Sequence, residues 1–205
     1  SIFDSRPDLR GGTLVLGGDG RFYNRHAVQT ILKMAAANGV DRVMVGQRGL
    51  LSTPAVSAII RKHRAQGGIV LSASHNPGGP AGDFGIKFNV PNGGPAPESV
   101  TEAIYQRTQV INRYYIDDAA DIPIDETGKF SIGKMSVIII DPVADYAELM
   151  ERLFDFDAIH DLFASGFRMR FDAMHAITGP YAREILEHRL GATAGTVING
   201  EPREG

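Results

Sequence analysis

The sequence lacks several features that would indicate an extracellular or membrane protein. None of its 205 residues is cysteine, so no disulfide bond can stabilise the fold. There is no Asn-x-Ser/Thr glycosylation site, and no apolar run approaches the roughly 20 residues that a membrane-spanning helix needs. The amino terminus does not read as a secretory signal. We therefore expect a cytoplasmic protein that has no membrane partner.

An excess of positive charge is also missing. The chain has 21 Lys and Arg against 24 Asp and Glu, a formal net charge of -3, and its basic residues are scattered. A nucleic-acid interface would need a basic patch, so we expect no nucleic-acid partner. With 43% hydrophobic and 22% charged residues, the composition is that of a globular protein with a complete core.

Both common nucleotide-binding signatures are absent as well. A glycine-rich turn at residues 17–20 follows an apolar run at residues 13–16, which makes a dinucleotide-binding fold the obvious alternative. That fingerprint would require glycine where Tyr23 stands, and the P-loop pattern G-x-x-x-x-G-K-[ST] does not occur. We therefore expect no nucleotide site.

What the chain does contain is an alternation of apolar runs with amphipathic segments. Strands are predicted at residues 13–16, 41–45, 69–71, 85–90 and 135–140, and helices at 24–38, 53–66, 98–115, 142–154 and 158–164. We expect Asn24 and Thr53 to cap the first two helices, Leu153 and Phe154 to be buried, and residues 116–134 to be irregular. This order predicts an α/β fold with a mixed, mostly parallel sheet sandwiched between helices.

A change of composition at Ser165 and Gly166 predicts a domain boundary. Residues 1–165 would form the first domain, and residues 166–205 an incomplete second α/β unit of strand, helix and strand. That second unit carries too little apolar surface to be stable by itself. We therefore expect the chain to be part of a longer protein.

The strand at residues 69–71 runs directly into a polar, glycine-rich loop that contains Ser74. Glycines let such a loop approach an anion and present N–H groups to it. Ser74 could act as a nucleophile, with His75 and Lys87 available as base or cation. Ligands of such sheets bind beyond the carboxyl ends of the strands, where Ser74 is expected. Ordinary turn chemistry, with Lys87 as a solvated lysine, is the alternative.

The residues of this loop also resemble those of a known family. The strings Ser74–Gly79 and Gly82–Phe88 are similar to the phosphoserine loop of the α-D-phosphohexomutases, most closely those acting on glucose phosphates. Further strings resemble the same family in the same order: residues 17–23, 35–39, 51–56, 92–97, 154–156, 170–175 and 179–181. The resemblance covers most of the chain.

This resemblance implies an intramolecular phosphotransferase, an isomerase that interconverts glucose 1-phosphate and glucose 6-phosphate through glucose 1,6-bisphosphate. Ser74 would be the phosphoserine, Lys87 the general acid/base, and His75 a residue lining the sugar site. Asp19, Arg21 and Asn76 would support the substrate or the loop. For Asp19 and Arg21, a surface ion pair at the entry of a helix is the alternative.

The resemblance also implies Mg²⁺, bound through the phosphate on Ser74 and by three aspartates of a D-G-D-G-D-R loop. That loop is absent from this sequence, as are the family's T-S-G-L-R segment, its G-E-E-S sugar-recognition loop and its carboxy-terminal phosphate-binding domain. We therefore expect the chain alone to be inactive. Two other functions remain open: a non-catalytic scaffold or binding relative, and a mutase for mannose or N-acetylglucosamine phosphates.

Overall fold

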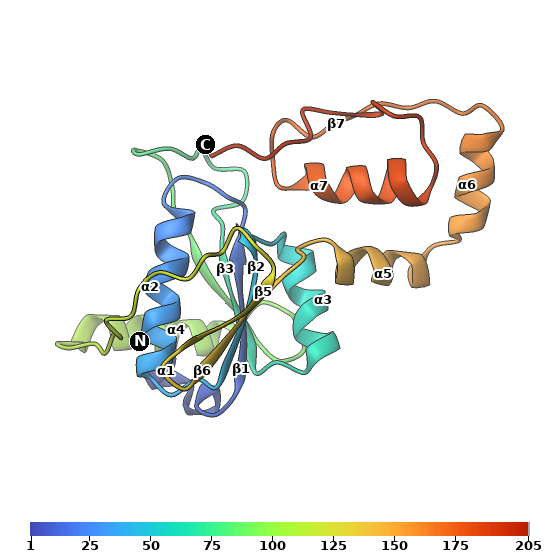
Figure 1. Cartoon of the computed structure of the whole chain (residues 1–205). Helices are drawn as coiled ribbons and strands as arrows, with labels where there is room; N and C mark the ends of the chain where they lie inside the picture. Colours follow the sequence, from blue (N-terminus) through green and yellow to red (C-terminus); the bar gives the residue numbers. More distant parts are fainter. Residues whose placement is uncertain (205) are drawn as a thin grey trace.

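A computed structural model describes residues 1–204, and its centre is a six-stranded sheet (Figure 1). The strands are β1 (Thr13–Gly18), β2 (Arg42–Leu50), β3 (Gly67–Leu71), β4 (Ile86–Asn89), β5 (Gly128–Ile132) and β6 (Met135–Ile140). Their order is β4-β3-β1-β2-β6-β5; the four central strands are parallel, and β4 and β5 are antiparallel edges. The predicted mixed, mostly parallel α/β sheet is confirmed.

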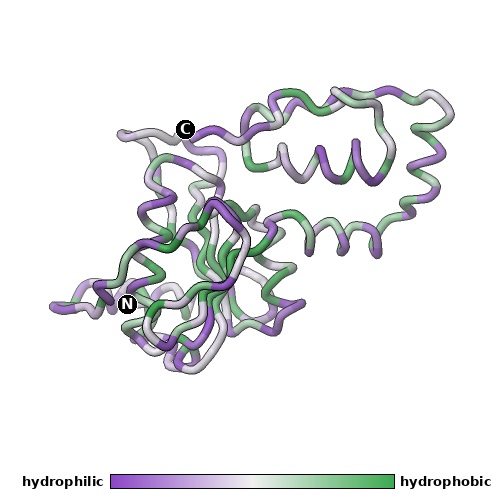
Figure 2. Tube along the Cα trace, in the orientation of Figure 1, coloured by the Kyte–Doolittle hydropathy of each residue, from purple (hydrophilic) through white to green (hydrophobic). Residues whose placement is uncertain are grey.

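Helices cover both faces of this sheet, because its strands are apolar on both sides. They are α1 (Ile2–Ser5), η1 (Pro7–Leu9), α2 (Asn24–Ala37), α3 (Thr53–His63), α4 (Glu98–Val110) and α5 (Ala144–Leu153). Two further helices, α6 (Phe156–Ala164) and α7 (Thr178–Ala182), lie beyond the sheet (Figure 1). Along β1, Leu14 and Leu16 enter the core on the α2 side, and Val15 enters the core on the α3 and α5 side. Figure 2 shows the hydrophobic stretches concentrated in the central strands.

Two predicted helix caps are wrong by one residue. Tyr23, with a left-handed backbone, precedes α2, while Asn24 is buried and donates from Nδ2 to the carbonyl of Gly49 at 3.1 Å. Ser52 rather than Thr53 caps α3, since its hydroxyl accepts the N–H of Ala55 at 3.3 Å. Serine and threonine are both favoured cap residues, so the sequence pattern does not fix which of two adjacent positions is the cap.

The strand β5 lies within the stretch that was expected to be irregular. It pairs antiparallel with β6 across a tight turn in which Gly133 has a φ of 55°. Its side chains alternate between exposed positions, such as Lys129 and Ser131, and the buried Ile132. An edge strand with one solvated face reads as polar, which explains why the apolar pattern did not reveal it.

Beyond the sheet, residues 171–198 form a smaller β-α-β unit, as predicted. The short strands β7 (Phe171–Asp172) and β8 (Val197–Ile198) are parallel, and α7 and the π-helix η2 (Arg183–Arg189) connect them. Figure 1 shows this second unit, with α6, extending away from the main sheet. Across residues 1–204, no helix combines the length and the apolar character needed to cross a bilayer.

The predicted burial of Leu153 and Phe154 is wrong, since their exposed fractions are 64% and 57%. Both lie at the junction of α5 and α6, where the chain leaves the sheet (Figure 1). The helix α6, expected to close the first domain, packs through Phe163 against Leu190 and Ala192. A division of the chain at residue 165 stays a prediction, and this packing favours counting α6 with the second unit.

A charged cluster joins α3 to α5. Lys62 donates to Oδ1 of Asp145 at 2.7 Å and also contacts Glu148, while Nε2 of His63 lies 2.8 Å from Oδ2 of Asp145. Burial by itself would raise the pKa of Asp145, but the hydrogen bonds from Lys62 and His63 bring it below its ordinary value of 3.8. The folded state therefore favours the ionised carboxylate.

We expect Asp145→Asn to lower the free energy of unfolding by about 1 kcal/mol near neutral pH. Because the folded pKa is below the unfolded one, this stabilisation is fully present above the unfolded value of 3.8 and is lost as pH falls through the folded pKa. Urea unfolding at several pH values measures the difference between variant and wild type. Asp161→Asn, at a carboxylate that is 87% exposed, is the control. A difference that grows on acidification would contradict the prediction.

Candidate active site

The loop that follows β3 places Ser74 at the carboxyl edge of the sheet. Ser74 has a left-handed backbone with a φ of 57°, and its N–H donates to Oγ of Ser72 at 3.1 Å. The N–H of Ser72 in turn donates to the carbonyl of Gly85 at 3.0 Å, which closes the base of the loop. A Cβ at Gly85 would lie 2.3 Å from the oxygen of Ser72, so only glycine fits there. The exposed Ser74 hydroxyl is thus held on a loop whose base is closed.

The returning strand β4 brings Lys87 to this hydroxyl. Lys87 is paired in antiparallel register with Val70 of β3, and its Nζ donates to Oγ of Ser74 at 2.9 Å. Thirteen residues separate Ser74 and Lys87 in sequence, yet the β3–β4 hairpin makes them neighbours. The structure therefore brings together the predicted nucleophile and the predicted acid/base.

Arg21 links the turn after β1 to the same loop. Its guanidinium pairs with the carboxylate of Asp19 at 2.9 Å and donates to the carbonyls of Asp83 and Ser74, at 2.7 and 3.2 Å. The hydrogen bond to Asp19 raises the pKa of Arg21 further, so this side chain stays charged. Arg21 is only 8% exposed and Asp19 20%. The pair is therefore mostly buried, which differs from the surface ion pair of the alternative interpretation.

The other two predicted residues differ in their placement. Asn76 donates from Nδ2 to Oδ2 of Asp83 at 2.8 Å and lines a cavity beside Ser74. His75 is exposed, and its side chain is not part of the cavity wall. The structure thus places Asn76 with Ser74, and it places His75 outside this wall.

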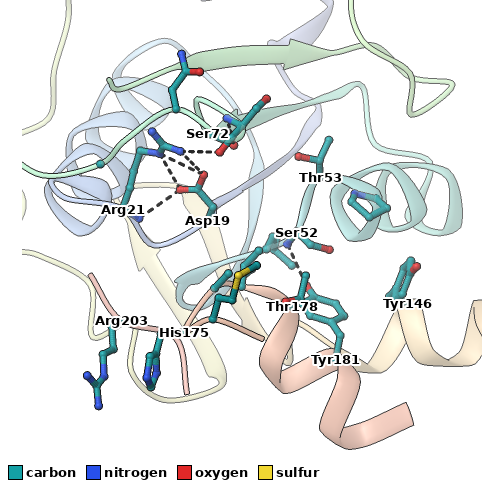
Figure 3. A pocket seen from close by; sticks show the side chains of 18 residues that line it. Asp19, Arg21, Ser52, Thr53, Ser72, Tyr146, His175, Thr178, Tyr181 and Arg203 are labelled. Atoms are coloured by element: carbon teal, nitrogen blue, oxygen red, sulfur yellow. Dashed lines mark hydrogen bonds and ion pairs between the residues drawn. The ribbon is translucent and has the colours of Figure 1, made fainter. Parts of the chain in front are cut away.

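The cavity has a volume of about 660 Å³ and lies between the two units (Figure 3). One wall is the Ser74 loop with Asp19 and Arg21, and a second is the amino-terminal end of α3. A third wall comes from the second unit. The lining residues that lie outside the predicted set of site residues are Leu51, Ser52, Thr53, Pro54, Ser72, Gly78, Tyr146, Met174, His175, Ala176, Ile177, Thr178, Tyr181 and Arg203. Many of them lie in the sequence strings that resemble the family, and this resemblance is the signal that could have identified them as site residues.

Strained backbone shapes the wall from the second unit. Met174, His175 and Asn199 have φ values of 51°, 56° and 50°, which non-glycine residues rarely adopt. Oδ1 of Asp172 accepts both the N–H of Met174 and Nδ2 of Asn199 at 2.9 Å, and these two hydrogen bonds lower the pKa of Asp172. Nδ1 of His175 lies 3.0 Å from the carbonyl of Glu201. Because a carbonyl only accepts, Nδ1 carries the proton.

The residues near Ser74 do not form a magnesium cage by themselves. Mg²⁺ needs several oxygen ligands, but Asp19 is paired with Arg21, and Asp83 accepts from Asn76. Among residues 1–204, no three His, Cys, Asp or Glu side chains gather in a way that could hold a metal ion. The predicted contribution of Ser74 to a metal site, through a phosphate on its oxygen, stays a prediction.

The fold and this site describe an α/β protein with a hydroxyl–amine pair beside an open cavity, and comparisons with known proteins specify the family. The family described as phosphoglucomutase/phosphomannomutase, alpha/beta/alpha domain I, matches residues 2–114. The chain therefore belongs to the phosphoglucomutase/phosphomannomutase family. This finding confirms the resemblance that was first seen in the loop around Ser74.

Individual relatives agree with this membership. A phosphoglucomutase from Rhizobium radiobacter is 61% identical over 202 residues, which are 98% of this chain and 37% of the relative. The chloroplastic phosphoglucomutase 1 of Marchantia polymorpha is 54% identical over 207 residues, covering all of this chain and 32% of the relative. The chain thus spans about a third of the length of these relatives.

Known structures show the same fold. The open form of parafusin, a phosphoglucomutase from Paramecium, has a TM-score of 0.93 at 43% identity, over 99% of this chain and 39% of that one. A Thermus thermophilus protein described as a putative phosphomannomutase has a TM-score of 0.73 at 24% identity, over 98% of this chain and 40% of that one. The second likeness concerns the fold alone.

We expect Arg21→Met to destabilise the protein by about 3 kcal/mol, because it leaves the Asp19 carboxylate and two loop carbonyls without their donor. Arg21→Lys should restore little, since an ammonium cannot reproduce the planar fork of hydrogen bonds. Thermal unfolding measures the stability, and amide hydrogen exchange over residues 74–83 measures the order of the loop.

Arg25→Met is the matched control for this experiment. It breaks an arginine–aspartate pair of similar length, Arg25 with Asp125, whose side chains are 54% and 59% exposed. Its effect should stay below about 1 kcal/mol. Equal effects of the two methionine variants, or full rescue by Arg21→Lys, would show that the buried pair does not hold the loop.

Proposed function

We propose that this chain carries the phosphoryl-transfer serine of a phosphoglucomutase, which interconverts glucose 1-phosphate and glucose 6-phosphate through glucose 1,6-bisphosphate. The observation that carries the proposal is the 2.9 Å contact between Nζ of Lys87 and Oγ of Ser74 beside the cavity. The names of the similar proteins support the choice of reaction. A non-catalytic relative would have no need to keep this pair assembled.

Ser74 and Lys87 would share the chemistry at one oxygen atom. When a phosphoryl group passes from Ser74 to a sugar hydroxyl, the bond between Oγ and phosphorus breaks, and Oγ needs a proton. Nζ of Lys87 is close enough to give it. In the return step, Oγ bonds to the phosphorus of the other phosphate and returns its proton to Nζ of Lys87, while the bond between that phosphorus and its sugar oxygen breaks. The sugar hydroxyl releases its proton to solvent when it receives the phosphoryl group, and the sugar oxygen freed in the return step takes up a proton from solvent.

The charge of a phosphorylated Ser74 also needs compensation, since a phosphoserine carries about 1.5 to 2 negative charges near pH 7. Lys87 supplies one nearby positive charge. Arg21 is already engaged with Asp19 and with the loop carbonyls, so it holds the loop rather than the phosphate. We assign Asp19 and Arg21 to loop support, and Asn76 to the loop and the cavity wall.

His75 and Mg²⁺ also have roles in the proposed reaction. His75 would line the sugar site once a substrate occupies the cavity. Mg²⁺ would bind an oxygen of the phosphate on Ser74, with further ligands from outside the described residues. Since residues 1–204 gather no metal site, we infer that the chain alone is inactive. A cytoplasmic location also stays a proposal, and some relatives are named chloroplastic.

In the full-length protein, Ser74→Ala should abolish mutase turnover, because no other described side chain presents a hydroxyl to Nζ of Lys87. The side chain is exposed, so the free energy of unfolding should change by less than about 0.5 kcal/mol. A coupled assay for glucose 6-phosphate measures turnover, and Ser131→Ala, on the exposed face of β5, is the matched control. Activity of Ser74→Ala near the wild-type level would rule out the phosphoserine role. A wild-type protein without activity would favour the scaffold alternative.

Lys87→Met should slow the phosphorylation of Ser74 by glucose 1,6-bisphosphate about 10²- to 10⁴-fold, the usual value of positioned acid/base help. The intact mass of the protein, followed over time, reports the added phosphate. Lys129→Met removes the charge of an exposed lysine on β5 and should leave the rate unchanged. If Lys87→Met reacts at the same rate as this control, Lys87 is a solvated strand residue without an acid/base role.

A further inference from the structure

One side chain of the second unit is buried in the core of the first. Tyr181, on α7, is 6% exposed and packs within the cluster formed by α3, α5 and the sheet. Its hydroxyl accepts the backbone N–H of Ser52 at 3.0 Å, as the dashed line in Figure 3 shows. The edge of its ring meets Tyr146 of α5, with centroids 5.5 Å apart. Tyr181 thus joins the second unit to the cap residue of α3.

The other polar links between the units are more exposed. The ion pair between Arg189 of η2 and Glu151 of α5 is 2.8 Å long, and its side chains are 26% and 42% exposed. The ion pair between Arg48 and Glu201 has side chains that are 49% and 63% exposed. The N–H of Tyr23 lies 3.4 Å from Oε1 of Glu204, and this contact is also exposed. Exposed pairs contribute little because solvent screens them and ordering them costs entropy. Ile177 and Ile185 of the second unit also pack against the same cluster, but they are only partly buried. Among the described residues, Tyr181 is therefore the most buried polar link between the units.

This link lies next to the cavity wall. Residues 174–178 line the cavity, and so does Tyr181 itself. Because α7 begins at Thr178, Tyr181 lies less than one helical turn beyond the segment 174–178. Ser52 lies on the opposite side of the contact and also lines the cavity. By contrast, Ser74 and Lys87 meet within the β3–β4 hairpin, without help from the second unit. Movement of Tyr181 would change the width of the cavity but not the Ser74–Lys87 contact.

We propose that Tyr181 is a positioning residue: its hydroxyl, anchored on the N–H of Ser52, holds the wall of residues 174–178 at a set distance from the Ser74 loop. Burial raises the pKa of Tyr181, so the hydroxyl stays neutral. The role extends the proposed mutase function, because that wall faces the sugar phosphate that Ser74 would serve. The effect of losing the hydroxyl should therefore appear in substrate binding.

The first experiment measures the position of the wall in the 205-residue chain and needs no catalysis. Because the sequence has no cysteine, Ala37→Cys on α2 and Ala194→Cys in the second unit provide two unique spin-label sites, both exposed. Pulsed electron paramagnetic resonance then gives the distribution of distances between the two spin labels, one on each unit. Tyr181→Phe, which removes only the hydroxyl, should broaden or shift this distribution. Tyr105→Phe, at an exposed tyrosine of α4, should leave it unchanged.

The second experiment measures initial rates of the same variants in the full-length protein. Tyr181→Phe should raise KM for the sugar phosphate about threefold to tenfold, the range expected for one lost hydrogen bond, while kcat changes less than twofold. A purely structural role would instead reduce the folded fraction, which lowers the apparent kcat and leaves KM unchanged.

An unchanged distance distribution for Tyr181→Phe would overturn the proposal, whatever the kinetics show. A lower kcat with an unchanged KM would also overturn it. If the wild-type protein has no mutase activity, the proposed function fails while the distance measurement still decides the role of Tyr181. The proposal is supported when Tyr181→Phe alters the distances, and raises KM wherever activity exists.

Discussion

The site depends first on the mostly buried pair of Arg21 and Asp19. Arg21 bonds at once to the carboxylate of Asp19 and to carbonyls on both arms of the Ser74 loop, so three chain segments meet at one guanidinium. Without this clamp the polar loop would sample many conformations, and fixing each of its residues costs conformational entropy. Because arginine offers five donors in a rigid plane, one side chain can restrain the whole loop.

The two units supply different parts of the site. The reacting oxygen of Ser74 lies in the loop after β3, and its partner Lys87 lies on the adjacent strand β4, so both belong to the first unit and meet without any contact from the second. The opposite wall depends on packing at Tyr181 and on strained residues such as His175. The Ser74–Lys87 pair and the opposite wall can thus change independently of each other, because different contacts hold each of them in place. Phosphoryl transfer relies on the positioning of the substrate, so the contacts that hold the opposite wall also matter for the reaction.

Much of the fold was readable from local patterns. Buried parallel strands are continuous apolar runs, and β1, β3 and β6 stand out for that reason. The loop around Ser74 was equally visible, because glycine, proline and small polar residues follow such a strand at once. The strand β5 was not visible, since an edge strand needs only one apolar face. The exposure of Leu153 and Phe154 was unexpected because periodicity shows an apolar face but not whether another element covers it.

By itself, therefore, the sequence determined the α/β class, the family, and the candidate roles of Ser74 and Lys87, since these depend on residue types and spacings along the chain. Only the tertiary structure decided that Lys87 touches Ser74, that Arg21 is a mostly buried clamp, and that His75 lies outside the cavity wall. It alone brought the wall of residues 174–178 and Tyr181 into the site. The physical reason is that contacts between distant segments depend on strand register and on the packing of one unit against another, which no local pattern encodes.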